Sequence, residues 1–189
     1  MDLILLQPGD PAVFGGDNSW KNGGSLIDNE WRDEVLNLGQ CLELVSIHQG
    51  MKQQITTDVS NSARTSGRPI ITEFTCVKYV DKTSVKLYEY CLSATPLGAT
   101  ADHPTYLYIG RNSGPAKTAN ILKIALRDAI ISEIQFQSHP DDMPTEQFKL
   151  NFTEILWTYT IQAADMTTPG SLHAGWSIAR NRPISSFTA

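Results

Sequence analysis

The sequence lacks a cluster of positive charge and a long apolar run. Its 15 Lys and Arg residues stand against 20 Asp and Glu residues, for a formal net charge of -5. Without a basic stretch to follow a phosphate backbone, we expect no nucleic-acid partner. The first apolar run ends at Leu6, and Asp2 stands where a secretory leader needs positive charge. We therefore expect no signal peptide and no membrane insertion.

The sequence also lacks a framework of paired cysteines. Cys41, Cys76 and Cys91 are an odd number at wide spacing, which favours reduced thiols over disulfides. Cys91 is expected to be buried and unreactive on the packing face of a helix. These features predict a protein made in a reducing cytosol, and any export has to proceed without a cleavable leader.

Motifs for catalysis or cofactor binding are missing as well. The four histidines are scattered, and no pair has the spacing of a helical zinc site. No nucleophile elbow, phosphate-binding loop or Cys-His signature is present. His139, Asp141 and Asp142 lie close together, but a solvated turn explains them better than a cation site. We predict no catalytic residues, no metal site and no cofactor.

What the sequence contains is the composition of one globular domain spanning residues 1–189. Apolar residues make up 41% and charged residues 19% of the chain. Two long polar stretches interrupt it. The first, an insertion at about 8–39, is expected to be a surface excursion pinned by Trp20 and Trp31. The second is an extended loop at about 50–68 that contains few large apolar groups.

Most of the remaining chain shows strand signals, expected at 2–6, 41–49, 69–80, 105–111, 145–163 and 172–180. A longer segment over 122–137 alternates with period 2. Its even positions form an apolar face: Leu122, Ile124, Leu126, Ile130, Ile134 and Phe136. Its odd positions include polar residues: Lys123, Arg127, Glu133, Gln135 and Gln137. In 145–163 the apolar parity flips near Thr153 and Glu154. Either a bulge re-aims that strand, or its two halves bury opposite faces.

One helix is predicted, directly after the strand within FTCVKYVDKTSVKLYEYCLSA (74–94). Asp81 or Thr83 can cap its first turn, and Lys86 and Glu89 form an i, i+3 pair. Its packing face is expected to hold Val85, Tyr88, Cys91 and Leu92. Seven to nine strands with one helix indicate a mainly antiparallel sandwich or small barrel with the helix at its side.

The same stretch resembles the strand-to-helix signature of the haemolysin-coregulated protein (Hcp) family of bacterial type VI secretion. Phe74, Lys78, Asp81, Ser84 and Leu87 stand at the signature positions. The family's order is also matched by LELVSIHQGMKQQ, LKIALRDAIISEIQFQ, EQFKLNFTEILWTYTIQ and AGWSIARNRP, over about residues 40–183. Two departures are a longer 8–39 segment and Val85, where the family usually has Pro.

The resemblance implies a fold and a structural function. Two antiparallel sheets would close into a small β-barrel with one α-helix packed at its side. Six copies would form a ring, and stacked rings would form the inner tube of the secretion system. A contractile sheath would expel that tube with a spike protein at its tip and secreted effectors in its channel. The chain would then pass from the bacterial cytoplasm to the extracellular space or a target cell without a signal peptide.

Three surfaces are assigned residues on this basis. The extended loop is expected to contact the neighbouring ring through Lys52, Gln53, Gln54, Thr57, Asp58, Asn61 and Arg64. A subunit interface is placed at Ile155, Trp157, Tyr159 and Ile161, because a ring former needs apolar surface beyond its own core. The channel-facing residues are expected to be Lys123, Glu133 and Gln135.

Two other functions remain open at the level of sequence. One is a monomeric β-sandwich that binds a ligand such as carbohydrate, with Trp20 and Trp31 stacking on it. The other is a hydrolase within the same fold. The mass of the particle distinguishes a ring of six from both alternatives.

Overall fold

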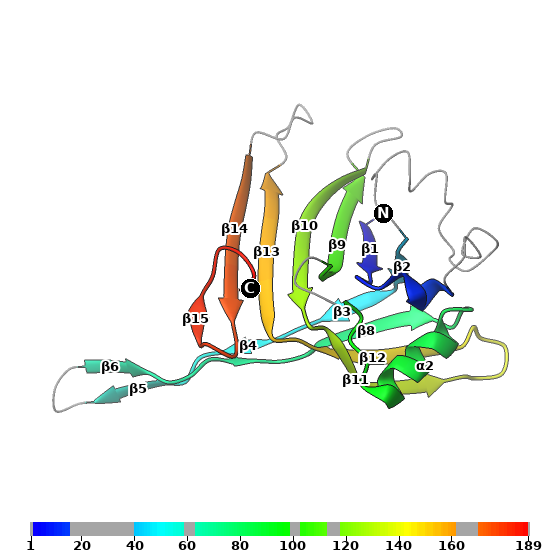
Figure 1. The fold of residues 1–189 in the computed structure, drawn as a ribbon, viewed down its shortest axis with the longest axis horizontal. Coiled ribbons are helices and arrows are strands. Elements are labelled where there is room, and N and C mark those ends of the chain that lie inside the picture. Colours follow the sequence, from blue (N-terminus) through cyan, green and yellow to red (C-terminus); the bar gives the residue numbers. More distant parts are fainter. Residues whose placement is uncertain are drawn as a thin grey trace.

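The computed structural model describes residues 2–15, 40–58, 63–98, 103–112, 118–161 and 170–188. Two antiparallel sheets dominate these residues (Figure 1). The first contains, in spatial order, β15 (Arg182–Pro183), β14 (Gly170–Ser177), β13 (Glu154–Ile161), β10 (Thr118–Arg127), β9 (Thr105–Asn112), β1 (Asp2–Gln7) and β2 (Leu42–Leu44). The second contains β11 (Ile130–Gln137), β12 (Thr145–Asn151), β8 (Phe74–Tyr79) and β3 (Ser46–His48). The prediction of a mainly β chain is confirmed.

The core lies between these two sheets. Leu107, Leu126 and Ile155 from the seven-stranded sheet meet Phe148 and Leu150 from the four-stranded sheet, and all five are fully buried. Burying one such side chain stabilises the fold by about 1.5–3 kcal/mol. Among the described strands neither sheet closes on itself, because the hydrogen-bonded order ends at β15 and β2 in one and at β11 and β3 in the other. The sheets enclose the core by packing rather than by a continuous hydrogen-bonded barrel.

A two-stranded ribbon bends from one sheet into the other. β10 pairs with β13 in the seven-stranded sheet, and their continuations β11 and β12 pair in the four-stranded sheet. At the bend, Asp128 has a φ of 51°, and Thr153 donates from N to Arg127 O at 3.1 Å and from Oγ1 to Asp128 Oδ2 at 2.8 Å. The parity flip near Thr153 therefore separates two halves that lie in different sheets.

Two predicted strands are wrong in the same way. The segment from Leu122 to Phe136 is divided between β10 and β11, and 41–49 is divided at Val45 between β2 and β3. Val45 N donates to Val77 O at 2.7 Å as the chain enters the four-stranded sheet. Hydrophobic alternation alone did not reveal either corner, because apolar residues continue on both sides of each.

Helix α2 (Ser84–Ser93) is the only α-helix in the described part of the chain, and it follows β8 as predicted. Its predicted packing face is wrong at two of four positions, since Tyr88 and Cys91 are half-buried but Val85 and Leu92 are not. Val85 and Leu92 are 70% and 89% exposed, whereas Ser84, Leu87 and Tyr90 are buried. Polar bonds to Ser84 turn that side of the helix inward, as described below.

The start of α2 and its surface pair agree with the sequence analysis. Asp81 Oδ1 accepts a hydrogen bond from Thr83 N at 2.8 Å, while Thr83 makes no side-chain capping bond. Lys86 Nζ lies 2.7 Å from Glu89 Oε2. Cys91 is half-buried at the edge of the core, so it is more accessible than predicted.

The first residues of the 8–39 insertion are fixed to the body by the short 3-10 helix η1 (Pro11–Phe14). Asp10 Oδ1 accepts from Ala12 N at 2.9 Å, and Asp10 Oδ2 accepts from Tyr90 OH of α2 at 2.6 Å. Val13 and Phe14 are buried in the core. The remainder of the insertion, with Trp20 and Trp31, lies outside the described residues.

The extended polar loop expected at 50–68 contains strands and forms a β-structured arm, a feature that the polar composition did not predict. At its base β4 (Met51–Lys52) pairs with β7 (Ile70–Ile71), and farther out β5 (Ile55–Asp58) pairs with β6 (Ala63–Ser66). In Figure 1 the β5–β6 hairpin projects beyond both sheets, at the opposite end of the molecule from α2. Backbone pairing needs no apolar side chains, so the polar composition did not prevent strand formation.

Candidate functional site

A buried ion pair joins β8 to β12 beside the start of α2. Lys78 Nζ lies 2.8 Å from Glu146 Oε1, and the two side chains are 1% and 0% exposed. The same ammonium contacts Asp81 Oδ1 at 3.1 Å and donates to Tyr79 O at 2.9 Å. It also lies 3.2 Å from Ser84 Oγ. Each proton of the buried ammonium therefore has an acceptor within reach.

The Glu146 carboxylate receives two more hydrogen bonds, both from α2. Ser84 Oγ donates to Oε1 and Tyr88 OH donates to Oε2, each at 2.8 Å. Burial, and then the hydrogen bond to Glu146, raise the pKa of Tyr88 to about 12, so the phenol remains a donor at neutral pH. We call Lys78, Asp81, Ser84, Tyr88 and Glu146 the buried anchor. Because its charges are bonded to one another, its geometry supports a structural role rather than catalysis.

The base of the arm is fixed by polar bonds to the body. Thr72 Oγ1 lies 2.8 Å from Gly50 N and 3.0 Å from Gly50 O, and these contacts join the outgoing and returning segments at the base of the arm. Arg68 Nη2 donates to Ile178 O at 2.5 Å, across to the segment after β14. The arm thus has a fixed direction where it leaves the body.

The predicted ring-contact residues are distributed along this arm. Lys52, Gln53 and Gln54 lie exposed near its base, and Gln53 Nε2 donates to Gly67 O at 2.5 Å. Farther out, Thr57 and Asp58 pair in register with Arg64 and Ala63. Asn61 lies outside the described residues.

The predicted interface residues of β13 pass from the core to the surface. Ile155 is 0% exposed, so it belongs to the subunit core and we correct its assignment to an interface. Trp157 packs partly against the core, whereas Tyr159 and Ile161 are 47% and 39% exposed. Leu172 of β14 lies opposite Tyr159 and is 64% exposed. We call Tyr159, Ile161 and Leu172 the apolar strip.

Trp157 also lines a groove between the arm base and the seven-stranded sheet. The groove has a volume of about 460 Å³ and includes Met51 and Ile71 from the arm and Trp176 from β14. Met51 is 62% exposed. The groove therefore places apolar surface of the arm next to apolar surface of the sheet.

The predicted channel residues do not share one surface. Glu133 and Gln135 lie on β11 in the four-stranded sheet, and Lys123 lies on β10 in the seven-stranded sheet. Lys149 Nζ contacts Glu133 Oε2 at 2.5 Å, and this hydrogen bond lowers the pKa of Glu133. One face of the four-stranded sheet carries two cross-strand rows of mainly polar residues: Glu133, Lys149, Thr75 and His48, and Gln135, Gln147, Val77 and Ser46. Lys123 cannot belong to this face.

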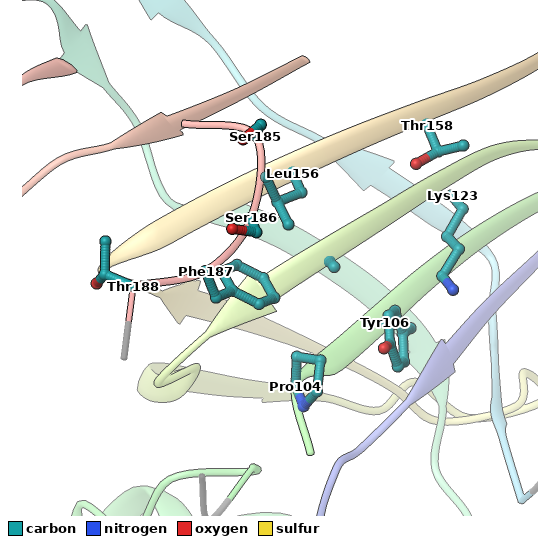
Figure 2. Close-up of a pocket in the computed structure, with 10 residues that line it drawn as sticks. Pro104, Tyr106, Lys123, Leu156, Thr158, Ser185, Ser186, Phe187 and Thr188 are labelled. Atoms are coloured by element: carbon teal, nitrogen blue, oxygen red, sulfur yellow. The ribbon is translucent and has the colours of Figure 1, made fainter. Parts of the chain in front are cut away.

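The segment after β15 is bound to the seven-stranded sheet, on the face that points away from the core. The sequence did not predict this site. Glu154 accepts from Thr188 N at 2.9 Å and from Thr188 Oγ1 at 2.8 Å, and Arg127 Nη1 lies 3.3 Å from its carboxylate. Arg127 also donates to Thr188 O. Burial alone would raise the pKa of Glu154, but hydrogen bonds from Thr188, Ser177 and Arg127 outweigh it and lower that pKa. Figure 2 shows this segment beside a pocket.

A protein-family model identifies the family of this chain. The model, described as the type VI secretion system effector Hcp, matches residues 39–159. The chain belongs to the Hcp family. No curated protein sequence matches it significantly.

Solved structures of Hcp proteins share the fold. A structure described as a type six secretion system protein aligns with a TM-score of 0.74 at 17% identity, covering 97% of this chain and 100% of its own. Hcp1 from Salmonella typhimurium gives 0.64 at 20% identity, covering 97% and 99%. A mutant form of Hcp1 from the E. coli EAEC 042 pathovar gives 0.61 at 18% identity, covering 94% and 97%. At these identities the likeness shows the fold.

The buried anchor explains the Hcp signature in this chain. The signature positions Lys78, Asp81 and Ser84 are three of its five members, and Leu87 is fully buried beside them. Phe74 packs on Phe152 with ring centroids 5.7 Å apart. Sequence reasoning noted Glu146 only as part of a matching strand. A buried lysine needs a buried acid, which is a signal that would have pointed to it.

No metal-binding cluster and no membrane-crossing helix occur in the described residues. No group of three or more His, Cys, Asp or Glu side chains there has the geometry to hold a metal ion. None of the helices in that part of the chain is long and apolar enough to span a membrane.

Proposed function

We propose that this Hcp chain is the subunit of the inner tube of a type VI secretion system. Six copies form a ring, rings stack into a tube, and a contractile sheath expels the tube with a spike protein at its tip and effectors in the channel. The observation that carries this proposal is the β5–β6 arm of this family member, which forms a two-stranded sheet of its own beyond the two sheets that enclose the core (Figure 1). We also propose that residues 1–189 form one domain.

The arm provides the contact between stacked rings in this proposal. Lys52, Gln53 and Gln54 lie exposed on its described base, beside the exposed apolar side chains of Met51 and Ile55. Thr57, Asp58, Asn61 and Arg64 complete the polar set. Exposed polar and ionic contacts are individually weak and favour specificity, which suits a tube that has to disassemble after delivery.

The apolar strip provides the contact between neighbours within one ring. Tyr159, Ile161 and Leu172 form an exposed apolar surface continuous with the half-buried Trp157. Such surface is expected at the centre of an interface, where aromatic side chains are enriched. A head-to-tail arrangement that buries this strip on each subunit closes into a ring when the rotation fits six copies.

The polar face of the four-stranded sheet supplies the channel wall. Glu133 and Gln135 lie on this face with Lys149, Gln147 and Thr75 in register. A flat face of paired polar side chains stays hydrated and does not hold a cargo by hydrophobic contact. Lys123 lies in the other sheet, so it is not part of this polar face.

The protein acts without catalysis or cofactor, and it reaches the extracellular space or a target cell from the bacterial cytoplasm with the tube. Its family is a component of a secretion system, and its buried ionisable groups at Lys78 and Glu146 are bonded to one another. Transport by the sheath accounts for its export in this proposal.

The mass of the purified particle tests the proposal. Light scattering should give six times the 20.9 kDa subunit mass, and electron micrographs should show rings. Tyr159→Lys should convert rings to monomers, because it places a charge in the apolar strip. Leu92→Lys on α2 is the matched control, since Leu92 is 89% exposed away from the strip and its charge should leave rings intact. A monodisperse wild-type monomer at micromolar concentration overturns the proposal.

A further inference from the structure

A second cavity lies on the face of the seven-stranded sheet that points away from the core. It measures about 510 Å³ and lies between the segment after β15 and strands β9, β10 and β13 (Figure 2). Its floor includes Ala125 and Leu156, and its sides include Pro104 and Phe187. This volume is in the range of sites that bind small ligands or short peptide segments.

Lys123 supplies the one cationic group of the lining. Its ammonium lies 4.2 Å from the ring centroid of Tyr106 and 5.9 Å from that of Tyr108. In the described part of the chain no carboxylate forms an ion pair with it. The aligned row of this face runs through Glu43, Leu5, Tyr108, Lys123 and Thr158. Glu43 is three strands away, about 14 Å at normal strand spacing, so it does not neutralise Lys123.

The opposite side of the cavity is fixed in place by the Glu154 site. Thr188 is bonded to Glu154 and Arg127, which holds Ser185, Ser186 and Phe187 against the sheet. No hydrogen bond involves either serine hydroxyl in the described residues, so both can donate to a ligand. Figure 2 shows Phe187 facing the cavity from one side and Lys123 with Tyr106 from the other. The site is therefore built before any ligand arrives.

We propose that this cavity binds a carboxylate carried on an apolar body, specifically the carboxyl terminus of a peptide that ends in an apolar residue. The carboxylate pairs with Lys123, the serine hydroxyls donate to it or to the adjacent peptide group, and the last side chain lies against Phe187 and Leu156. A single lysine matches the single charge of a carboxylate, whereas phosphate groups are usually held by several donors. Arg127 does not line the cavity, and its Nη1 is bound by Glu154 and Thr188.

This inference goes beyond the proposed function, because it requires neither a ring nor a stack. Burial raises the pKa of Tyr106, so its hydroxyl is neutral at physiological pH and adds no negative charge to the cavity. The apolar floor excludes water from one side of the Lys123 carboxylate pair, which strengthens it relative to an exposed pair.

Calorimetry with two peptides tests the site. Acetyl-Ala-Ala-Ala-Phe with a free carboxylate should bind at least about tenfold more tightly than the same peptide with a carboxamide end, since the amide lacks the charge. Lys123→Met should lose about the same factor toward the acid and little toward the amide. Lys86→Met on α2 is the control for loss of one positive charge and should bind like wild type.

Further measurements distinguish a peptide terminus from a free carboxylic acid as the ligand. Phe187→Ala should weaken both peptides, with circular dichroism confirming that each variant is folded. 3-Phenylpropionate has the same chemistry without the peptide, so equal binding of this acid assigns the site to free carboxylic acids, and weaker binding assigns it to chain termini. Equal affinity for acid and amide, or unchanged binding by Lys123→Met, overturns the proposal.

Discussion

The two ends of the molecule are stabilised in opposite ways. At the α2 end, the buried anchor places Lys78 and Glu146 at 1% and 0% exposure and bonds both within a closed network. At the other end, the arm consists of short paired strands, and Met51 at its base and Ile55 at the start of β5 are 62% and 60% exposed. Figure 1 shows the two regions on opposite sides of the sheets.

This difference separates residues that specify the fold from residues free to contact another molecule. A buried charge without a partner is costly, so the anchor holds β8, β12 and α2 in one arrangement. A hairpin held mainly by backbone bonds contributes little apolar burial and opens locally at low free energy. The signature of the Hcp family therefore marks the stable end, while the proposed assembly contact lies at the weaker end.

Removing one partner of the anchor should have the largest effect on stability. Glu146→Ala leaves the Lys78 ammonium buried without its main acceptor, and we expect a loss of about 3–5 kcal/mol in the free energy of unfolding. Urea denaturation measures this loss. Glu89→Ala is the matched control, because it removes an exposed pair with Lys86 and should cost no more than about 0.5 kcal/mol.

Replacing both partners sharpens this prediction. The double variant Lys78→Met, Glu146→Leu removes both charges and should be more stable than Glu146→Ala, because no unpaired ion remains. A Glu146→Ala variant as stable as the Glu89→Ala control would show that the anchor does not hold the subunit together.

A smaller effect is expected at the Glu154 site, and it depends on pH. The folded-state pKa of Glu154 is lowered, so its stabilisation is fully present above the unfolded pKa of about 4.3 and is lost as pH falls through the lower, folded pKa. Glu154→Gln should therefore cost about 1–2 kcal/mol at pH 7 and progressively less below pH 4. Urea denaturation at both pH values, with Glu89→Gln as control, checks this. A cost that is constant with pH would contradict the assignment.

The cysteines should differ in reactivity while affecting stability only modestly. Cys76 is fully buried, and burial raises its pKa to about 12, whereas Cys91 is half-buried. A thiol reagent should therefore label Cys91 first in the folded protein. Cys76→Ala should lower the free energy of unfolding by about 1–2 kcal/mol. Reducing agent should leave the particle mass unchanged, and loss of rings on reduction would contradict free thiols.

Local sequence patterns predicted elements more accurately than their orientation. The helix after β8 and the parity flip at Thr153 were found because each follows from spacing along the chain. The buried face of α2 was not, because the hydrophobic pattern selects Val85 and Leu92 over Ser84. Ser84 is inside because Lys78 and Glu146 bind it, and the bond to Glu146 spans 62 positions in the sequence.

The same limit applies to the surfaces. Ile155 at the start of β13 lies in the core, whereas Tyr159 and Ile161 farther along the same strand are exposed, and the shared parity of the three does not show this difference. Lys123 and Glu133 share a polar parity in sequence, yet a corner at Asp128 sends them into different sheets. Period-2 alternation gives the face within one strand and carries no information on which sheet that strand joins.

Loss of the arm should cause the smallest change in the free energy of unfolding of the subunit. The same change should abolish the stacking of rings. Replacing residues 52–66 by a short Gly-Ser linker retains Arg68, Thr72 and the core, so the free energy of unfolding should change by less than about 0.5 kcal/mol. Rings should persist by light scattering, while tubes disappear from electron micrographs and export stops. Exchanging only Gln53 and Gln54 for alanine is a milder variant, which should shorten the tubes without abolishing them. If the shortened protein still stacks and is exported, the contact between rings lies elsewhere, and the 8–39 insertion becomes the next segment to replace.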